Sequence, residues 1–353
     1  MPDSSPGLAS VDGLHTLAQR YGDALTLGHL VEAGVDRLPL PGAGHTLARW
    51  RVLASVAAHD LSLVKLFEGH TDALAILAEL GGAPATEPHA LWGTWCAEPP
   101  DARVTLDADE AGRISLSGTK AWCSGAATVT HAVVSCWNAA GEPCLAAVAI
   151  RQPGVRVTDE GWHAVGMAGS ASVDVHFDNA QAVQIGQPGD YVRRPGFWQG
   201  GAGIAACWFG GALGIAQRVR RPGGAKPDAH RLAHLGAIDV ALTPAAAMLR
   251  EAAAWIDRHP RDNAQRVAMR VRLAVEQAAT QVMHHAGRAV GAGPLCREPH
   301  FARAMADLPV FLRQSHAERD LAGLGQLALD DAAAATQDNE QDNKQKGPPS
   351  WTL

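Results

Sequence analysis

The chain has 353 residues and carries a formal net charge of −6 at neutral pH. This length fits one large unit built of several parts, and the acidic balance argues against a surface for nucleic acid or an anionic membrane. The six cysteines include no Cys-x-x-Cys pair, which indicates reduced thiols and not a disulfide framework or a metal site. The first residues show no signal pattern and no run of 18 apolar residues occurs, so we expect a soluble, cytoplasmic protein.

Residues 1–90 are expected to form a helical N-terminal domain. One amphipathic helix from His45 to about Glu68 is predicted by apolar residues that recur at helical spacing, at Leu47, Trp50, Leu53, Ala57, Leu61 and Val64. Prolines at positions 39 and 41 end the helical segment before it. His70 is expected near the end of this helix, as a structural residue and not as a ligand.

Residues 91–186 are expected to form an antiparallel β-domain. Period-two alternation, cut by Gly, Pro and Asn, predicts short strands and tight turns around Ile114 and Leu116, Val129 to Val133, and Val173 to Phe177. Two tryptophan-bearing turns, residues 120–125 and 161–170, interrupt the strands. An indole offers stacking area and a hydroxyl offers a hydrogen bond, so these turns suit a flat aromatic cofactor at the mouth of a barrel.

Residues 187–330 are expected to form a C-terminal bundle of four antiparallel helices. The predicted helices span residues 203–219, 232–257, 263–292 and 301–329. Three glycines in the first of them, Gly210, Gly211 and Gly214, permit close contact with another helix. Residues 331–353 are polar and poor in apolar side chains, which predicts a flexible tail.

Three phrases of the β-domain resemble, in the same order, the middle domain of the acyl-CoA dehydrogenase family of flavoproteins. They are the Ser-Gly-x-Lys-x-Trp-x-Ser turn at 117–124, the Trp-x-x-x-Gly-Met-x-Gly-Ser turn at 162–170, and the Val-x-Phe strand at 175–177. The resemblance implies an α+β fold with a helical N-terminal domain, a middle antiparallel β-barrel-like domain and a C-terminal four-helix bundle.

The resemblance also implies FAD as the cofactor. It places Trp122 against the isoalloxazine ring and the Ser124 hydroxyl near flavin N5, with Cys123 between them. The alternative is a barrel turn that holds a buried Trp and a capping Ser, without a cofactor.

The resemblance further implies that the backbone of Trp95, Cys96 and Ala97 faces the flavin. Here the chain departs from the family pattern, because Ala97 replaces a threonine and the Gly-x-Gly-Ser-Asp continuation is absent. The contact that the family makes with an acyl-thioester is therefore in doubt.

A second flavin half-site normally comes from a neighbouring subunit in this family. Arg231, Arg288 and Gly291 stand nearest to its positions, and arginines can bind a pyrophosphate through charge-assisted hydrogen bonds. The resemblance thus implies a homodimer or homotetramer. The alternative for any one arginine is a solvated residue at a helix end.

No acidic residue occupies the two positions where the family places its catalytic base. Glu318 and His316 follow on the expected fourth helix and are the candidates, with a slight preference for Glu318 because the family uses carboxylates. Two residues apart on a helix, they cannot both point into one pocket. The alternative is a charged bundle surface without catalytic function.

These observations favour an acyl-CoA dehydrogenase-like FAD oxidoreductase that acts on an acyl-thioester or a similarly activated small molecule and passes electrons to a partner. A flavin-dependent monooxygenase of the same fold is the alternative, because such enzymes dispense with the glutamate. A third alternative is a degenerate, non-catalytic member of the family. No nucleic-acid or membrane partner is expected.

Overall fold

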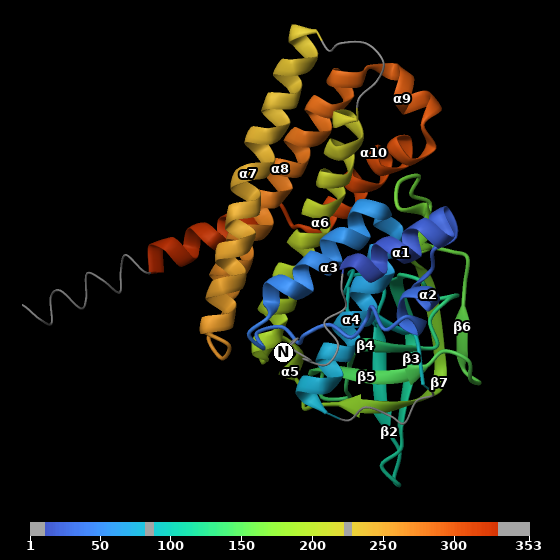
Figure 1. Cartoon of the computed structure of the whole chain (residues 1–353). Coiled ribbons are helices and arrows are strands. Elements are labelled where there is room, and N and C mark those ends of the chain that lie inside the picture. Colours follow the sequence, from blue (N-terminus) through green and yellow to red (C-terminus); the bar gives the residue numbers. More distant parts are fainter. Residues whose placement is uncertain (1–10, 82–87, 222–227, 331–353) are drawn as a thin grey trace, which may run out of the picture.

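The computed structural model describes residues 11–81, 88–221 and 228–330, and the predicted tail at 331–353 lies outside them. Figure 1 shows a β-barrel below, N-terminal helices against it, and a bundle of long helices that extends away from both. One apolar core runs through all three parts without interruption. This arrangement confirms the predicted α+β fold.

The N-terminal helices are two long ones where a single helix was predicted. The chain turns at Asp60, whose backbone is extended (φ −152°, ψ 127°) and whose carboxylate accepts a hydrogen bond from the Leu63 N–H at 2.7 Å. Asp60 therefore ends one helix and caps the next. The helical elements of this part are α1 (Val11–Tyr21), η1 (Gly22–Ala24), α2 (Leu27–Glu32), α3 (Thr46–His59) and α4 (Leu61–Leu80).

The strands close into a barrel, because β4 pairs with both β5 and β2 while β2, β3, β7 and β5 follow one another around the sheet. β1 pairs with β4 in parallel, as β2 does at Thr105 and Trp137, whereas antiparallel strands were predicted. β6 adds to the outside of β7. The strands are β1 (Trp92–Trp95), β2 (Val104–Ala108), β3 (Ile114–Cys123), β4 (His131–Trp137), β5 (Pro143–Ala149), β6 (Val155–Val157) and β7 (Val173–Ile185), with η2 (Ala168–Ser170) between the last two.

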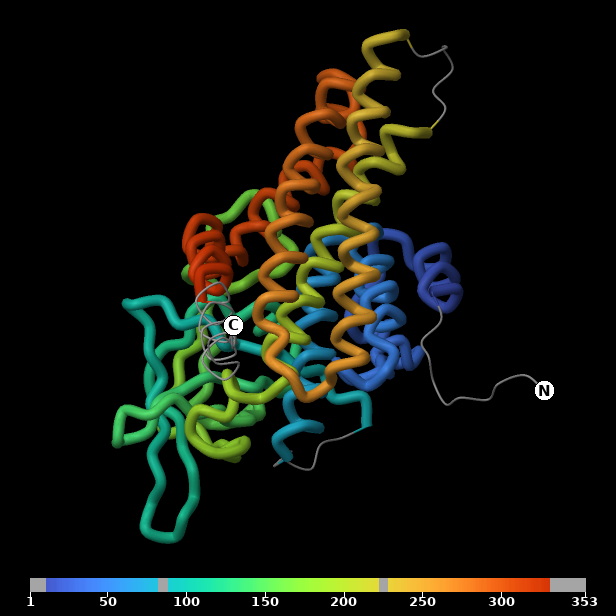
Figure 2. Tube along the Cα trace, turned by 90° about the vertical axis from the view of Figure 1, so that its left-hand side faces the viewer, coloured from blue at the N-terminus to red at the C-terminus, as the bar shows by residue number. Residues whose placement is uncertain are grey.

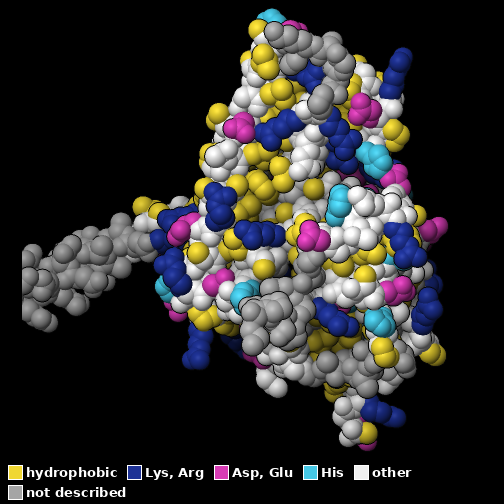
Figure 3. Space-filling view, in the orientation of Figure 1, with side chains coloured by type: hydrophobic (Ala, Val, Ile, Leu, Met, Phe, Trp, Pro, Cys, Tyr) yellow, Lys and Arg dark blue, Asp and Glu magenta, His cyan; other side chains and the backbone are white. Residues whose placement is uncertain are grey.

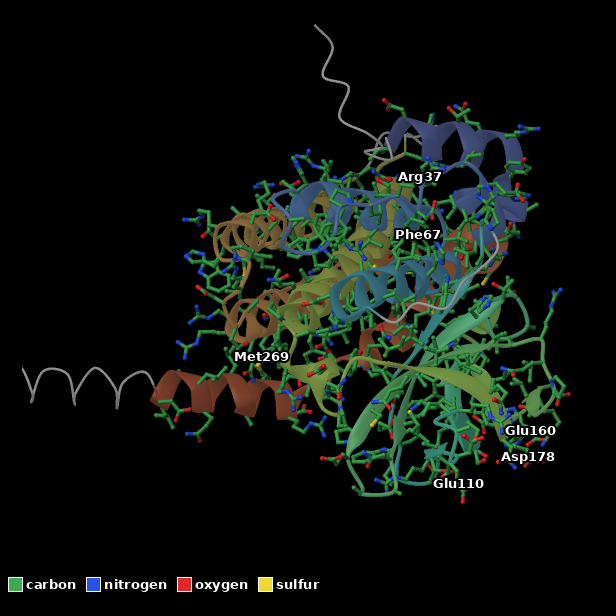
Figure 4. The ribbon with its side chains drawn as sticks, turned by 90° about the horizontal axis from the view of Figure 1, so that it is seen from below. Arg37, Phe67, Glu110, Glu160, Asp178 and Met269 are labelled. Carbon is green, nitrogen blue, oxygen red and sulfur yellow. The ribbon has the colours of Figure 1, made fainter. Side chains whose placement is uncertain are left out.

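The bundle is built from α6 (Pro195–Arg220), α7 (Ala229–Arg258) and α8 (Gln265–Val290), which Figure 2 shows side by side along their lengths. The predicted fourth helix is broken, because Ala317 has φ 44° and residues 315–317 are not helical. The remaining elements are α5 (Asp190–Arg193), α9 (Ala292–Arg297), α10 (Pro299–Phe311), η3 (Leu312–Gln314) and a helical segment at 318–330. A Cβ added to Gly323 of this segment would lie 3.0 Å from the Met269 Cε of α8. Figure 4 shows Met269 beside this segment.

The glycines of α6 serve packing within the chain. A Cβ on Gly210 would lie 2.1 Å from the Ala54 carbonyl oxygen of α3, and one on Gly214 would lie 2.7 Å from that of Ala58. The two helices therefore approach backbone to backbone. The close helix contact that these glycines predict is thus made with α3 of the same chain.

Helix α7 is long and apolar enough to cross a membrane by length and composition alone. It packs lengthwise on α8 and carries exposed apolar side chains on its outer side, among them Leu232, Val240 and Met248. Figure 3 shows hydrophobic side chains gathered along the bundle helices. A bundle helix that another subunit covers has the same composition as a membrane span, so this feature does not identify a membrane protein.

Candidate functional site

The turn at the end of β3 presents an indole to solvent. Trp122 is 52% exposed and has φ 58°, a left-handed conformation that costs a non-glycine residue about 1–3 kcal/mol. The next residue, Cys123, is completely buried. Gly125 (φ 69°) lies against Leu66 of α4, which brings that helix directly beside the turn. A strained backbone that exposes a large ring is typical of a binding site and not of a structural turn.

Behind the turn, Trp95 fills the barrel. Its indole is 2% exposed and its Nε1–H donates to the Ser124 carbonyl at 3.2 Å. The Trp95 ring therefore supports the turn from inside, while only its backbone remains for contact with a ligand.

Three serine hydroxyls form a chain next to Trp122. Ser124 Oγ lies 2.8 Å from Ser172 Oγ, which lies 2.9 Å from Ser170 Oγ. Ser170 Oγ in turn donates to the Met167 carbonyl at 2.8 Å. Ser170 and Ser172 are buried, and Ser124 is half-buried at the open end of the chain.

The Gly-Met-x-Gly-Ser phrase is the point where the barrel meets α10. A Cβ on Gly166 would lie 1.9 Å from the Ala306 carbonyl oxygen of α10, so only glycine fits there. The Met167 N–H donates to Asp307 Oδ1 at 2.5 Å, and Trp162 Nε1 donates to the Met167 carbonyl at 3.2 Å. Burial raises the pKa of Asp307 above its ordinary value, although the hydrogen bond from Met167 opposes this shift.

The end of β1 is fixed to α4 and leaves two backbone donors free. Thr94 donates to the Gly69 carbonyl at 2.7 Å, and the Trp92 N–H donates to His70 Nδ1 at 3.0 Å. His70 is thus a buried residue in the middle of α4 and not a helix-end residue. The N–H groups of Cys96 and Ala97 donate to none of the residues that the structure describes.

The Lys of the first phrase and the Glu that follows Ala97 link β3 and β4 to the segment that follows β1. Lys120 is completely buried, and its ammonium group lies 2.6 Å from the Glu98 carboxylate and 2.7 Å from the Ser135 hydroxyl. Trp137 Nε1 also donates to Glu98 at 3.1 Å. Burial alone would raise the pKa of Glu98, but these hydrogen bonds lower it below its ordinary value. Both motif residues therefore have a structural function.

Sequence reasoning missed a row of charged residues on α4. Lys65, Glu68 and Asp72 lie at helical spacing on the side of α4 that meets α6, where a Cβ on Gly200 would be 3.0 Å from Asp72 Oδ1. Lys65 and Glu68 pair at 3.2 Å. The spacing was a usable signal, because charges at i, i+3 and i+7 interrupt an otherwise apolar helix.

Asp72 has neither a hydrogen bond nor an ion pair with any described residue. Burial and the nearby Glu68 carboxylate raise its pKa, against the attraction of the buried Arg194 and Arg49. It also lies near Cys96, whose thiol pKa burial raises to about 11, with the Asp72 charge adding to the shift. An unpaired carboxyl group among buried charges is a candidate for substrate binding or proton transfer.

The predicted second half-site lies at the other end of the bundle. Arg231 is in the first turn of α7, while Arg288 and Gly291 are at the end of α8, and Figure 1 shows both helix ends away from the barrel. Arg231 donates to the Val219 carbonyl at 3.0 Å, and its buried Nε has no partner among the described residues. Within one chain these residues and Trp122 are not brought together.

The two base candidates are both exposed. His316 precedes the helical segment at 318–330 and lies 3.4 Å from Asp320, and Glu318 is the first residue of that segment. The continuous helix on which their assignment was based does not exist. Their exposure gives the assignment no support.

A shallow depression with a volume of about 600 Å³ opens beside the residues that follow the Trp122 turn, with the exposed Arg151 and Arg156 in its lining. Its floor is formed by apolar residues, among them Ala126, Val129 and Ile150. No group of three His, Cys, Asp or Glu side chains in the described part of the chain is placed to hold a metal ion.

No family model and no curated protein sequence matches the chain. Solved structures match it over nearly its whole length. A complex of TdsC from Paenibacillus sp. A11-2 with FMN and indole has a TM-score of 0.76 at 20% identity, covering 92% of this chain and 95% of that one. KijD3 in complex with FMN and dTDP-3-amino-2,3,6-trideoxy-4-keto-3-methyl-D-glucose has a TM-score of 0.75 at 22% identity, with coverages of 92% and 94%.

The butyryl-CoA dehydrogenase from Megasphaera elsdenii has a TM-score of 0.74 at 15% identity, covering 91% of this chain and 96% of that one. At such identities the likeness establishes the fold and leaves the reaction open. The chain has the fold of the acyl-CoA dehydrogenase-type flavoproteins, as the three sequence phrases predicted.

Proposed function

We propose that the protein is a flavin-dependent monooxygenase that acts on a polar small molecule. The observation that carries this proposal is the row Lys65, Glu68 and Asp72 on α4, the helix whose Leu66 lies against Gly125 of the Trp122 turn. An aliphatic acyl chain cannot form hydrogen bonds with ionised side chains, and it would displace the water that solvates them. A polar substrate can pair with them instead. TdsC, also described as a dibenzothiophene monooxygenase, has the same fold.

The residues present fit a flavin. The exposed Trp122 indole offers a stacking surface, the Cys96 and Ala97 N–H groups are free donors, and Ser124 ends the hydroxyl chain at the open side. When bound, a reduced flavin supplies two electrons for the activation of dioxygen. The protein's own contribution is to hold the ring, exclude water from it and orient the substrate.

FMN and FAD are the two candidate flavins, and FAD was the sequence prediction. KijD3 and TdsC are described with FMN. FAD would require the remote arginines Arg231 and Arg288, which only a second subunit can bring near Trp122. FMN needs no such contact, so we propose FMN as the bound flavin. FAD is the alternative if a second subunit supplies the arginines.

Assembly into a homodimer or homotetramer is part of this proposal. The outer side of α7 exposes Val240 (73%) and Leu232 (53%), which a monomer would leave in water. A stable interface buries roughly 1,200–2,000 Å² in total, an area that a helix of 30 residues and its neighbours can supply.

Acyl-CoA oxidation remains the second candidate function because Asp72 offers what that reaction needs. A base must accept a proton at neutral pH, and a carboxyl group with a raised pKa does so better than an ordinary one. His316 and Glu318 stay as proposals for this reaction only. Both are exposed, so either would have to be covered by substrate or by another subunit.

One set of measurements on the purified full-length protein separates these functions. Flavin binding is tested first: FMN or FAD at about a hundred times Kd should raise the free energy of unfolding by roughly 2.7 kcal/mol. Oxygen uptake that depends on NADH and a flavin reductase supports the monooxygenase. Anaerobic bleaching of bound flavin by an acyl-CoA supports the dehydrogenase, and a protein that binds neither flavin refutes both.

A further inference from the structure

The serine chain beside Trp122 has a fixed direction. The Met167 carbonyl has no hydrogen to give, so the Ser170 hydroxyl must donate to it across their 2.8 Å contact. The single hydroxyl hydrogen of Ser170 is then used, and Ser170 accepts from Ser172 at 2.9 Å. By the same count Ser172 accepts from Ser124 at 2.8 Å.

The hydrogen of Ser124 therefore points inward, to Ser172, and the two lone pairs of the Ser124 oxygen are left to accept hydrogen bonds. The direction of donation along the serine chain is fixed as long as the Met167 carbonyl keeps its position. The N–H of Met167 is bound to the buried Asp307, and its carbonyl also accepts from Trp162 Nε1 and from the Ser170 N–H at 3.0 Å. The chain thus presents an acceptor and not a donor at Ser124.

Oxidised and reduced flavins differ at the atom that concerns this hydroxyl. N5 of an oxidised flavin carries no hydrogen and accepts hydrogen bonds, whereas N5 of a reduced flavin carries a hydrogen and donates. From this difference and the direction of the chain we infer that the site selects the reduced flavin, with Ser170 and Ser172 as positioning residues that set the preference. The inference rests on the proposed function, in which Ser124 meets the flavin at N5.

This preference suits a monooxygenase that receives its flavin already reduced. It is less suited to a dehydrogenase, which must hold an oxidised flavin until the substrate reduces it. A single neutral hydrogen bond changes a binding constant about 3- to 10-fold. Binding the reduced form tenfold more tightly would raise the two-electron midpoint potential of the bound flavin by about 30 mV.

The test compares dissociation constants for reduced and oxidised FMN, measured by titration with and without oxygen, in wild type and three variants. Ser170→Ala removes the acceptor of Ser172, so Ser172 can donate to Ser124 and release the Ser124 hydrogen toward the flavin. Ser172→Ala releases it directly. Both variants should lose the preference for reduced FMN by about 3- to 10-fold, mainly by binding oxidised FMN more tightly.

Ser62→Ala is the matched control, because Ser62 is buried and lies against the same turn but outside the chain. A Cβ added to Gly169 would lie 3.1 Å from both the Cβ and the Oγ of Ser62. This variant should keep the wild-type ratio. Melting curves of all variants without flavin show whether they are folded. If one of the two serine variants does not fold, the other is enough for the test.

Wild-type protein that binds oxidised FMN as tightly as reduced FMN overturns the inference. So does a ratio that Ser170→Ala and Ser172→Ala leave unchanged, and in both cases the proposed flavin site still stands. Failure to bind FMN or FAD in either redox state refutes the proposed function and the inference together.

Discussion

Asp307 of α10 accepts a hydrogen bond from the Met167 N–H of the barrel across a 2.5 Å distance and 140 residues of sequence. The Met167 carbonyl on the other side of the same residue ends the serine chain that reaches Ser124. Through Met167, α10 is thus connected to the hydroxyl groups in the barrel.

Replacing Asp307 by Ala should cost about 1–3 kcal/mol in the free energy of unfolding, because the buried Met167 N–H loses its acceptor. Asp307→Asn is the matched control, since the amide oxygen still accepts this hydrogen bond, and it should cost less. Urea unfolding at pH 7 measures both. Equal stability of the Ala variant and the wild type would show that water replaces the carboxylate.

The same residue predicts a pH dependence. Burial raises the pKa of Asp307 from its ordinary value of 3.8, so the folded protein holds a proton that the unfolded chain has released in the interval above pH 3.8. Stability falls as pH rises wherever the folded state binds more protons. The difference in unfolding free energy between wild type and Asp307→Asn should therefore shrink or change sign from pH 4 upward, and a constant difference would contradict the raised pKa.

Local patterns in the sequence were sufficient to predict the strands of the barrel and its two tryptophan-bearing turns. Period-two alternation and turn glycines act between neighbours in the chain, so they are visible without a structure. The parallel pairing of β1 with β4 was missed because such pairing is decided by distant segments. The break at Asp60 was missed because the apolar stripe continues on both sides of it.

The candidate site was predictable only where a motif marks it. Trp122 and Ser124 were found through their phrase, and the structure explains Lys120 and Gly166 of the same phrases as structural residues. Asp72 belongs to no phrase, and its importance comes from buried neighbours on other elements. The break at Ala317, which removes the basis for a base on a fourth helix, had no sequence signal that we recognise.

Trp122 is expected to lower the stability of the flavin-free protein and to increase its affinity for flavin. Trp122→Gly relieves the left-handed backbone and should stabilise the flavin-free protein by about 1 kcal/mol relative to Trp122→Ala. Both variants should bind FMN roughly 10- to 100-fold more weakly, because stacking and buried ring area are lost. Thermal melting and fluorescence titration measure the two effects. Val165→Ala, at a side chain 89% exposed, should change neither.

A charge on the outer side of α7 should separate the subunits. Val240→Glu places a carboxylate in the proposed interface and should lower the mass seen by light scattering to that of a single chain of 36.9 kDa. Val192→Glu on α5 is the control, because that side chain is 54% exposed but lies outside the bundle. Wild-type protein that is already monomeric at micromolar concentration would rule out the interface, and with it the route by which Arg231 and Arg288 reach a flavin.

The carboxyl group of Asp72 makes no hydrogen bond or ion pair with the described residues and lies among buried charges. Its raised pKa means that ionisation at neutral pH costs the folded state free energy. Asp72→Asn removes that cost and should therefore raise the stability at pH 7, with an effect that diminishes as the pH falls toward 3.8. Flavin affinity should stay within about twofold, since Trp122 and the β1 donors are untouched.

Catalysis should respond in the opposite direction. If Asp72 transfers a proton in the reaction, Asp72→Asn should lower turnover by about 10²- to 10⁴-fold and remove the limb of the pH–rate profile that belongs to a carboxyl group with a pKa above 3.8. Oxygen uptake with reductase, or bleaching by acyl-CoA, is the assay according to which of the two functions is found. Glu251→Gln on α7, at a carboxylate 76% exposed, is the control and should leave stability and turnover unchanged. A gain in stability with unchanged turnover would show that Asp72 takes no part in the reaction. A loss of stability would contradict its raised pKa.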